Sequence, residues 1–216
     1  STTIVVPECP TMDQMAKAVD IVSDMLADFP FDTIADRANA WALLLTHIVR
    51  PLSKSLAMMC LVDSPEPGTG KGLLVSIVSI LTSGRSAAVS DMPSQDEELR
   101  KRITSMLIRG AGIVNFDNVE GQVRSPVLAM ALTADIWEDR VLGRSEMSAL
   151  PNQTVWTMTG NNVSLGGDLA RRTYRIRLDA HQANPWQRTK FRHNDLIGHV
   201  QEHRGEILAA LLTIVR

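Results

Sequence analysis

The sequence predicts an α/β fold, a doubly wound three-layer sandwich built around a parallel sheet. Short apolar segments typical of buried strands alternate with helical segments between residues 57 and 178. Strands that are separated by helices pair in parallel through right-handed crossovers. A glycine-rich turn joins the first strand to its helix, as in folds that bind a ligand at the carboxyl ends of their strands.

Two helices precede the first strand. The first opens at a capping box, Thr11–Gln14, and the second follows a similar signature at Thr33–Asp36 and ends at Pro51. Apolar residues recur at helical spacing along both segments. We therefore expect residues 1–55 to form a helical extension that packs on the core.

The core is expected over residues 56–180. Its strands are predicted at about 57–62, 87–90, 113–117, 154–159 and 173–178, and its helices at about 70–81, after a capping box at 94–97, and at about 125–134. Residues 181–216 are expected to form a basic connector and C-terminal helices, where a lid domain would begin. The abrupt start and finish favour a fragment of a longer protein.

The composition excludes several classes of protein. The chain has 216 residues and a net charge of −2, so there is no global polycation to indicate nucleic-acid binding. Cys9 and Cys60 are the only cysteines, and Cys60 lies inside an apolar strand, so a cytoplasmic location fits better than a disulfide framework. No apolar run is long enough to span a membrane, and we expect no membrane partner.

A glycine-rich turn, Pro67–Lys71, lies between the first strand and its helix. Such a turn points backbone N–H groups at one spot, the helix N-terminus adds partial positive charge, and Lys71 supplies a full charge for nucleotide phosphates. A turn with a chance lysine is the alternative. We expect the loop to bind ATP or GTP through these residues: Pro67, Gly68, Thr69, Gly70, Lys71, Gly72 and Leu73.

The loop departs from the usual phosphate-loop pattern at one chemically important position. Gly72 stands where a serine or threonine hydroxyl normally reaches Mg²⁺, and glycine offers no ligand there.

An acidic residue ends the predicted strand at 113–117. Asp117 is placed to hold Mg²⁺, and Asn118 follows where many ATPases have a glutamate that activates water. An amide can orient a water but cannot accept its proton, and Glu120 is an alternative base if the loop bends back. Alone, the Asp-Asn pair could equally be a turn that ends a strand.

A polar group also ends the predicted strand at 154–159. Asn161, in the stretch Thr159–Asn162, is expected to lie beside the γ-phosphate and to position the attacking water, with Asn162 as the second choice. A Gly-Asn-Asn turn without function is the alternative.

Arginines are dense around the last strand. Arg171 and Arg172 precede it and are expected to stabilise charge at a neighbouring subunit's nucleotide. Arg175 and Arg177 alternate with apolar residues and favour either a solvated strand face with local ion pairs or nucleic-acid contact. The basic stretch that follows contains Trp186 and Phe191, which could stack on bases or belong to a solvated connector.

The histidines give a weak metal signal. The segment His199–His203 fits an inverted zinc-protease motif, but Gly205 interrupts the helix, and a polar helix face is the preferred interpretation. The remaining histidines, His47, His181 and His193, show no ligand spacing.

Taken in order, the motifs resemble the AAA+ branch of P-loop ATPases. More narrowly, the chain resembles the ATPase domain of replicative helicase or primase-helicase proteins of phages and mobile elements. The narrower likeness rests on residues 67–74, 139–147, 159–162, 167–180 and 191–206.

The resemblance implies a five-stranded sheet of order 5-1-4-3-2, a ring oligomer such as a hexamer, and ATP with Mg²⁺ at subunit interfaces. It assigns Lys71 as the Walker A lysine, Asp117 as the Walker B acid and magnesium ligand, and Asn161 as sensor 1. Arg172 aligns with the arginine finger, and Arg140 and Arg144 are candidates for contact across the interface or with DNA.

Two functions follow as hypotheses. The first is a motor that hydrolyses ATP to move single-stranded or duplex DNA during replication of a mobile element. The second is a nucleotide-gated oligomerising or DNA-binding module with little hydrolysis, and Gly72 and Asn118 are the reasons for considering it.

Overall fold

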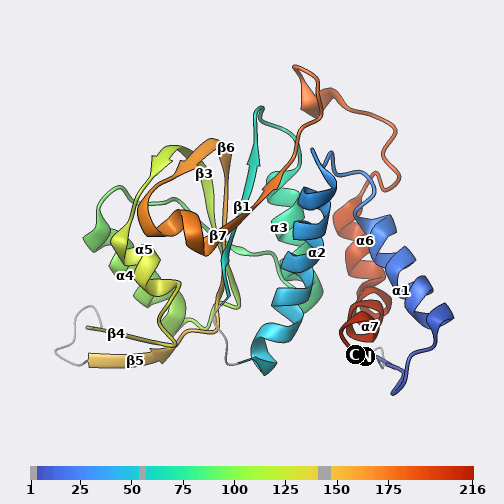
Figure 1. The fold of residues 1–216 in the computed structure, drawn as a ribbon, viewed down its shortest axis with the longest axis horizontal. Helices are drawn as coiled ribbons and strands as arrows, with labels where there is room; N and C mark the ends of the chain where they lie inside the picture. The colour runs from blue at the N-terminus through green and yellow to red at the C-terminus, as the bar shows by residue number, and fades with distance from the viewer. Residues whose placement is uncertain (1–3, 54–56, 141–146) are drawn as a thin grey trace.

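The computed structural model describes residues 4–53, 57–140 and 147–216. Its centre is a five-stranded parallel sheet (Figure 1) of order β2-β3-β6-β1-β7. The strands are β1 (Met59–Ser64), β2 (Ala88–Ser90), β3 (Ile113–Val123), β6 (Val155–Leu165) and β7 (Thr173–Arg177). Numbered within this sheet, the order is 5-1-4-3-2 read from one edge, which confirms the predicted topology.

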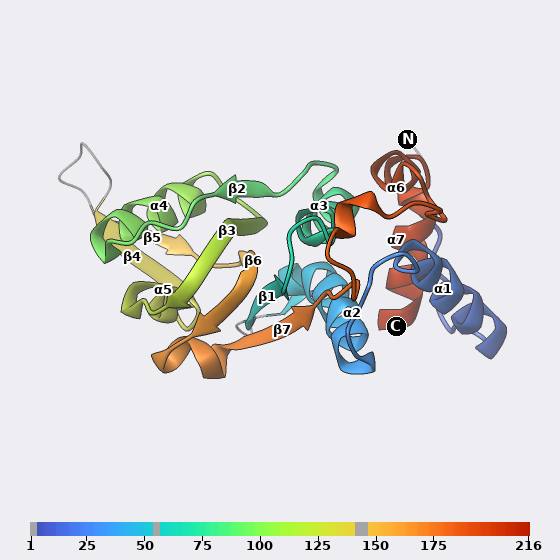
Figure 2. The same cartoon turned by 90° about the horizontal axis from the view of Figure 1, so that it is seen from above.

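Helices cover both faces of the sheet (Figure 2). On one face lie α3 (Lys71–Ser83) and α2 (Ile34–Val49), and on the other lie α4 (Asp96–Ile108) and α5 (Pro126–Ala131). Because successive side chains of a strand point to opposite faces, Cys60 of β1 joins the core under α3 while Leu61 joins the core under α4. None of the helices among the described residues is long and apolar enough to cross a membrane.

The first and last helices form a further layer beyond α2 and α3 (Figure 1). Helix α1 (Met12–Met25) packs against α7 (Arg204–Val215), and α6 (Leu196–Glu202) packs against α3. The capping boxes predicted for α1 and α2 are both formed. The two ends of the chain therefore share one apolar core with α3, and the division of the chain at residues 55 and 180 stays a prediction.

Two strands are longer than the sequence pattern indicates. Strands β3 and β6 continue past the predicted ends at residues 117 and 159, with register shifts between Phe116 and Val119 and between Glu120 and Gln122. Asn118 and Asn162 adopt left-handed backbone conformations, with φ of 53° and 50°. Asparagine tolerates this region better than most residues, so each strand can bend at its asparagine and then resume pairing.

Two local expectations were wrong. Helix α4 begins at Asp96 with Gln95 as a cap that makes no side-chain bond, so the capping box predicted at Ser94 does not form. An antiparallel hairpin, β4 (Ile136–Arg140) and β5 (Met147–Pro151), was not predicted. Only Trp137 of β4 is buried, because its ring packs in the core under α4, and a strand with one buried side chain leaves little apolar pattern.

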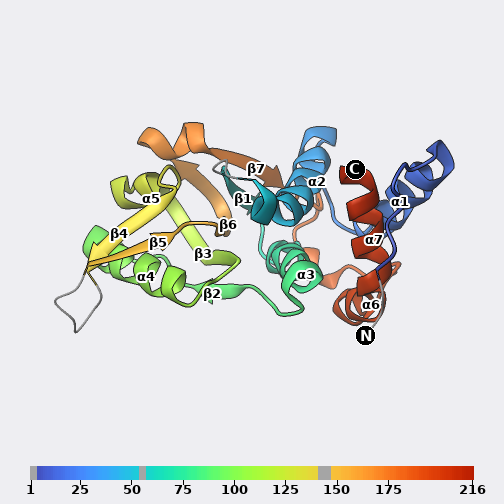
Figure 3. The same cartoon turned by 90° about the horizontal axis from the view of Figure 1, so that it is seen from below.

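The hairpin lies at the end of the molecule opposite to α1 and α7 (Figure 3). The indole Nε1 of Trp137 donates a hydrogen bond to Thr104 Oγ1 of α4 at 2.9 Å, which anchors β4 to the core. Arg140 is exposed at the end of β4, and Arg144 lies outside the described residues.

Within the described residues, three short 3-10 helices complete the fold. They are η1 (Arg50–Leu52), η2 (Gly167–Arg172) and η3 (Pro185–Gln187). The segment between β7 and α6, which contains η3, leaves the end of β7, passes beside the turn that joins β1 to α3 and continues to α6 (Figure 1). We call residues 181–195 the connector.

Candidate functional site

The glycine-rich loop joins the carboxyl end of β1 to the first residue of α3. Gly68 and Gly70 have φ of 79° and 98°, which a residue with a side chain adopts only with strain. A Cβ atom at Gly68 would lie 2.9 Å from Trp186 Cβ, so the connector packs directly on the loop. The conformation of the loop is therefore fixed by the left-handed backbone at its two glycines and by packing against the connector.

Lys71 is the point at which the loop meets the sheet. Its Nζ donates to Ser64 Oγ at 2.6 Å and to Asn161 Oδ1 at 2.7 Å. Ser64 ends β1 and faces Asn161 of β6 across the parallel pair. Burial lowers the pKa of the Lys71 ammonium group, and the charges of Asp63 and Asp117 act in the opposite direction. The structure therefore brings Lys71, Asn161 and Asp117 to one edge of the sheet, as the sequence predicts.

The two neighbouring asparagines of β6 point to different partners. Asn161 accepts hydrogen bonds from Lys71 and from Ser64 Oγ, the latter at 3.1 Å. Asn162 is exposed, and its Nδ2 donates to the carbonyl oxygen of Pro65 at 3.3 Å. Of the two, Asn161 is the one that contacts the lysine, and its role as sensor 1 stays a prediction.

Asp117 is exposed at the bend of β3, and a line of buried polar side chains holds it. Thr159 Oγ1 donates to Asp117 Oδ1. Behind it, Asn115 Nδ2 donates to Thr159 Oγ1 at 3.1 Å, and Thr157 Oγ1 donates to Asn115 Oδ1 at 3.0 Å. Buried polar groups of this kind orient the last member of the chain.

These supporting residues were missed in the sequence. A usable signal was present, because Asn115, Thr157 and Thr159 are polar residues at buried positions of two strands that lie side by side. Hydrogen bonding between them satisfies groups that would otherwise be costly to bury.

The residues at this edge fit Mg²⁺ with a single protein carboxylate. Asp117 supplies an oxygen ligand of the kind that Mg²⁺ prefers, and the ion commonly keeps several waters. Asn118 is exposed beside it with an amide that can orient a water but cannot deprotonate it. At Gly72, an added Cβ atom meets nothing within 4 Å, so the missing hydroxyl is not excluded by lack of space.

A cavity of about 230 Å³ adjoins the loop on the side of the connector. Gly68, Thr69 and Gly70 form one wall, and three aromatic side chains, Phe29, Trp186 and Phe191, form others. Arg188 lies over the Phe191 ring at 5.2 Å and donates to the carbonyl oxygen of Asp28 at 2.8 Å. Such apolar, aromatic walls beside a phosphate-binding loop fit the base of a nucleotide.

The loop also contains a polar atom with an unmet hydrogen bond. Thr69 Oγ1 is buried and has no hydrogen-bond partner among the described residues. A hydroxyl in that state fits a bound polar group, so the loop and the cavity together suit a nucleotide. Trp186 and Phe191, which the sequence assigned to nucleic-acid contact or to a solvated connector, line this cavity and remain exposed, at 58% and 37%. Their contact with nucleic acid stays a prediction.

Asp63 is a further residue that sequence reasoning missed. Its side chain is only 1% exposed, and it accepts hydrogen bonds from the backbone N–H of Val163 at 3.0 Å and from Arg177 Nη1 at 3.1 Å. Arg175 Nη1 lies 4.0 Å away. The signal was an acidic residue inside an apolar strand next to the loop. Contact of Arg175 and Arg177 with DNA or a neighbouring subunit stays a prediction.

The two arginines of η2 differ in exposure. Arg172 is mostly buried and binds within its own chain, to the carbonyl oxygen of Ala129, to Thr133 Oγ1 at 3.3 Å and to Asp168 Oδ2 at 3.1 Å. Arg171 is exposed and pairs with Asp168 at 2.9 Å. Either arginine must exchange these partners to act at a neighbouring subunit, and that role stays a prediction for both.

No protein-family model and no curated protein matches the chain. Among solved structures, the A-form apo structure of the NrS-1 C-terminal region matches with a TM-score of 0.59 and 15% identity, over 98% of this chain and 47% of that one. A second apo structure of that region matches with a TM-score of 0.52 and 14% identity, over 96% and 46%. The chain spans about half the length of these structures.

The X-ray structure of JCV helicase is a weaker match, with a TM-score of 0.45 and 15% identity over 95% of this chain and 54% of that one, and it supports no inference. The stronger matches share the arrangement of sheet and flanking helices over nearly the whole chain. At such low identity the likeness establishes the fold alone. The chain therefore shares with the NrS-1 C-terminal region an α/β fold in which helices cover both faces of a parallel five-stranded sheet.

Proposed function

We propose that this chain is the ATP-binding and ATP-hydrolysing motor domain of a DNA replication helicase or primase-helicase of a phage or mobile element. It acts in the cytoplasm as a ring oligomer, such as a hexamer. The observation that carries the proposal is the position of Lys71 Nζ, within 2.7 Å of both Ser64 Oγ and Asn161 Oδ1 at the edge where ligands of this fold bind.

Each residue of the site has a role that its position supports. Lys71 and the loop amides hold the phosphates, and Asp117 holds Mg²⁺, which neutralises charge on the phosphates when bound. Asn161 and Asn118 orient the water that attacks. Arg172 completes a neighbour's site after exchanging its bond to Asp168.

DNA contact is assigned to the β4–β5 hairpin. The hairpin lies at the end of the molecule away from α1 and α7 (Figure 3), and it presents the exposed Arg140. Arg144, the second candidate, lies outside the described residues. Arg175 and Arg177 are weaker candidates for DNA, because both lie against the buried carboxylate of Asp63. Guanidinium groups free of such partners bind phosphates more readily.

Steady-state release of phosphate from ATP, with and without single-stranded DNA, tests this function. We expect saturable, Mg²⁺-dependent turnover that DNA increases. The measurement is made across a range of protein concentrations, because a site shared between subunits works only in the assembled form. No turnover at any concentration, with oligomers demonstrated by light scattering, would exclude the motor.

The second candidate is a nucleotide-gated module that binds ATP but scarcely hydrolyses it. Two observations favour it: Gly72 supplies no metal ligand, and Asn118 stands in place of a base. This candidate predicts assembly or DNA retention that depends on ATP without release of phosphate.

The variant Gly72→Ser separates the two candidates. The hydroxyl reaches the position from which serine or threonine normally binds Mg²⁺, and the open space at Gly72 accommodates it. We expect turnover to rise by about tenfold, since each added oxygen ligand strengthens metal binding. Phosphate release is measured as a function of Mg²⁺ concentration.

Gly72→Ala is the matched control, because it adds the same Cβ atom without an oxygen, and like serine it favours the helix more than glycine does. Its turnover should stay within about twofold of the parent chain. If the parent chain is nearly inactive and Gly72→Ser raises its turnover, the result supports the gated module. Equal rates for both variants would show that another group already completes the metal site.

A further inference from the structure

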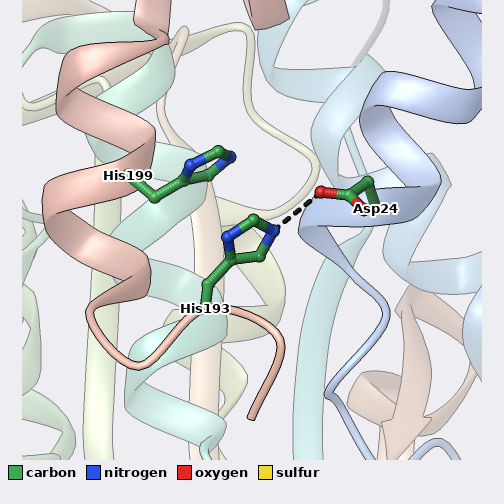
Figure 4. Close-up of side chains that lie close together, drawn as sticks. All are labelled: Asp24, His193 and His199. Carbon is green, nitrogen blue, oxygen red and sulfur yellow. Dashed lines mark hydrogen bonds and ion pairs between the residues drawn. The ribbon is translucent and has the colours of Figure 1, made fainter.

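Three side chains from separate parts of the sequence converge on the side of the molecule that carries α1 and α6 (Figure 4). They are Asp24 of α1, His193 of the connector and His199 of α6. One ligand atom of each lies within 4.8 Å of the ligand atoms of the other two. His193 Nε2 and Asp24 Oδ2 already share a hydrogen bond of 2.7 Å.

The two imidazole rings are arranged to offer nitrogen atoms to the same place. They stack with centroids 3.8 Å apart and planes inclined by 24°. Figure 4 shows that each ring directs a nitrogen away from its own backbone and toward the side on which Asp24 lies. Neutral imidazole nitrogen is the form that binds a metal ion.

The surroundings favour that neutral form. The pKa of His199 is lowered by burial and by the nearby rings of His193 and His203, and the carboxylates of Asp24 and Glu202 act in the opposite direction. His203 stacks on the other face of His199, with centroids 4.3 Å apart.

Further contacts hold the ligand atoms in place. Arg192 Nε pairs with the second oxygen of Asp24 at 2.6 Å. The backbone N–H groups of Arg192 and His193 both donate to Asp28 Oδ2, at 2.7 and 3.2 Å. Outer contacts of this type orient metal ligands and raise affinity.

We propose that Asp24, His193 and His199 form a structural site for a divalent transition-metal ion of the zinc class. Two imidazole nitrogens and one carboxylate oxygen suit Zn²⁺, which is commonly four-coordinate. The fourth position opens to a cavity of about 660 Å³ that Asp24, His199 and His203 line, and water can enter it there. The ion would replace the proton that His193 and Asp24 now share.

The site differs from the one that the sequence suggests. The motif at 199–203 pairs His199 with His203, but His203 Nδ1 contacts the carbonyl oxygen of His199 at 3.0 Å within the helix. The fold instead supplies Asp24 and His193, which are 169 residues apart. The ion ties α1, the connector and α6 together, and His193 also lines the cavity beside the phosphate loop.

Calorimetric titration of Zn²⁺ into the chelator-treated chain tests the proposal. We expect saturable binding of about one ion per chain and a rise in the thermal unfolding midpoint with Zn²⁺. Co²⁺ should give the visible absorption of a tetrahedral site. His199→Ala should weaken Zn²⁺ binding at least about tenfold, and Asp24→Asn should do so without removing a ring from the stack.

His181→Ala is the matched control, because His181 belongs to a second group with Asp32 and Asp179 on another part of the surface. It should leave Zn²⁺ affinity unchanged. No saturable binding, or parent-like affinity in both His199→Ala and Asp24→Asn, would overturn the proposal, as would loss of binding in His181→Ala alone. Lys71→Ala should bind Zn²⁺ normally, so a failure of the nucleotide site and a failure of the metal site are distinguished.

Discussion

Replacing Lys71 with alanine is expected to weaken ATP binding at least about a hundredfold. The ammonium group lies at the start of α3, where it can bind two phosphates at once, and each charge-assisted hydrogen bond contributes roughly 1.5–3 kcal/mol. In the structure the same group donates to Ser64 and Asn161, and these two bonds fix its position beside the loop. Fluorescence titration with a labelled ATP analogue measures the change.

Lys101→Ala is the matched control for Lys71→Ala. Lys101 lies on the surface of α4 and pairs with Glu97 at 3.0 Å, so the variant removes the same charge far from the loop. An exposed pair of this kind contributes little to stability, and ATP affinity should be unchanged. Thermal unfolding verifies that both variants are folded. Parent-like affinity in folded Lys71→Ala would show that the phosphate-loop assignment is wrong.

Asp117→Asn is expected to lower the rate of ATP hydrolysis by about 10²–10³-fold while ATP affinity stays within about threefold. Asparagine keeps the oxygen that accepts the hydrogen bond from Thr159, so the bend of β3 is preserved. The substitution removes the negative charge that holds Mg²⁺, so it lowers the rate of hydrolysis much more than the affinity for ATP. Single-turnover hydrolysis and equilibrium nucleotide binding, measured on the same preparation, separate the two effects.

Glu120→Gln serves as the comparison, because Glu120 is an exposed carboxylate three residues further along β3 and opposite Asn161 in the register with β6. If Asp117 is the metal ligand and Asn118 orients water, Glu120→Gln keeps most of the parent chain's rate of ATP hydrolysis. If instead Glu120→Gln loses turnover and Asp117→Asn does not, the acidic residue of the site is misassigned.

The fold was readable from the sequence because its signals are local. Each buried strand is a short apolar run, and each run is followed by a helical pattern, so the parallel order of the sheet follows from general rules of chain connection and from the family resemblance. The phosphate loop was readable for the same reason, since Gly68, Gly70 and Lys71 are neighbours in sequence. The β4–β5 hairpin was not predicted, because one buried tryptophan makes most of its contacts with the core and leaves little apolar pattern in the sequence.

Other parts of the site depend on contacts between residues far apart in the sequence. Asp63 pairs with Arg177, which is 114 residues further along the chain. Trp186 packs on Gly68 because the connector passes beside the glycine-rich loop. Periodicity reports which side of a strand or helix is buried, but it does not report which distant group that side contacts. For this reason the sequence predicted local ion pairs for Arg175 and Arg177 without identifying their partner, which the structure shows to be the buried carboxylate of Asp63.

The sequence alone determined the class of fold, the order of its strands through the family resemblance, and the loop that positions Lys71, because these rest on neighbouring residues and on general rules of connection. Only the tertiary structure decided that Asn161 rather than Asn162 meets the lysine, that aromatic side chains of the connector wall the cavity beside the loop, and that Asp24 joins two histidines. The physical reason is that side chains are brought together by the packing of whole elements, and that packing minimises the exposed apolar surface of the entire chain rather than of any one segment.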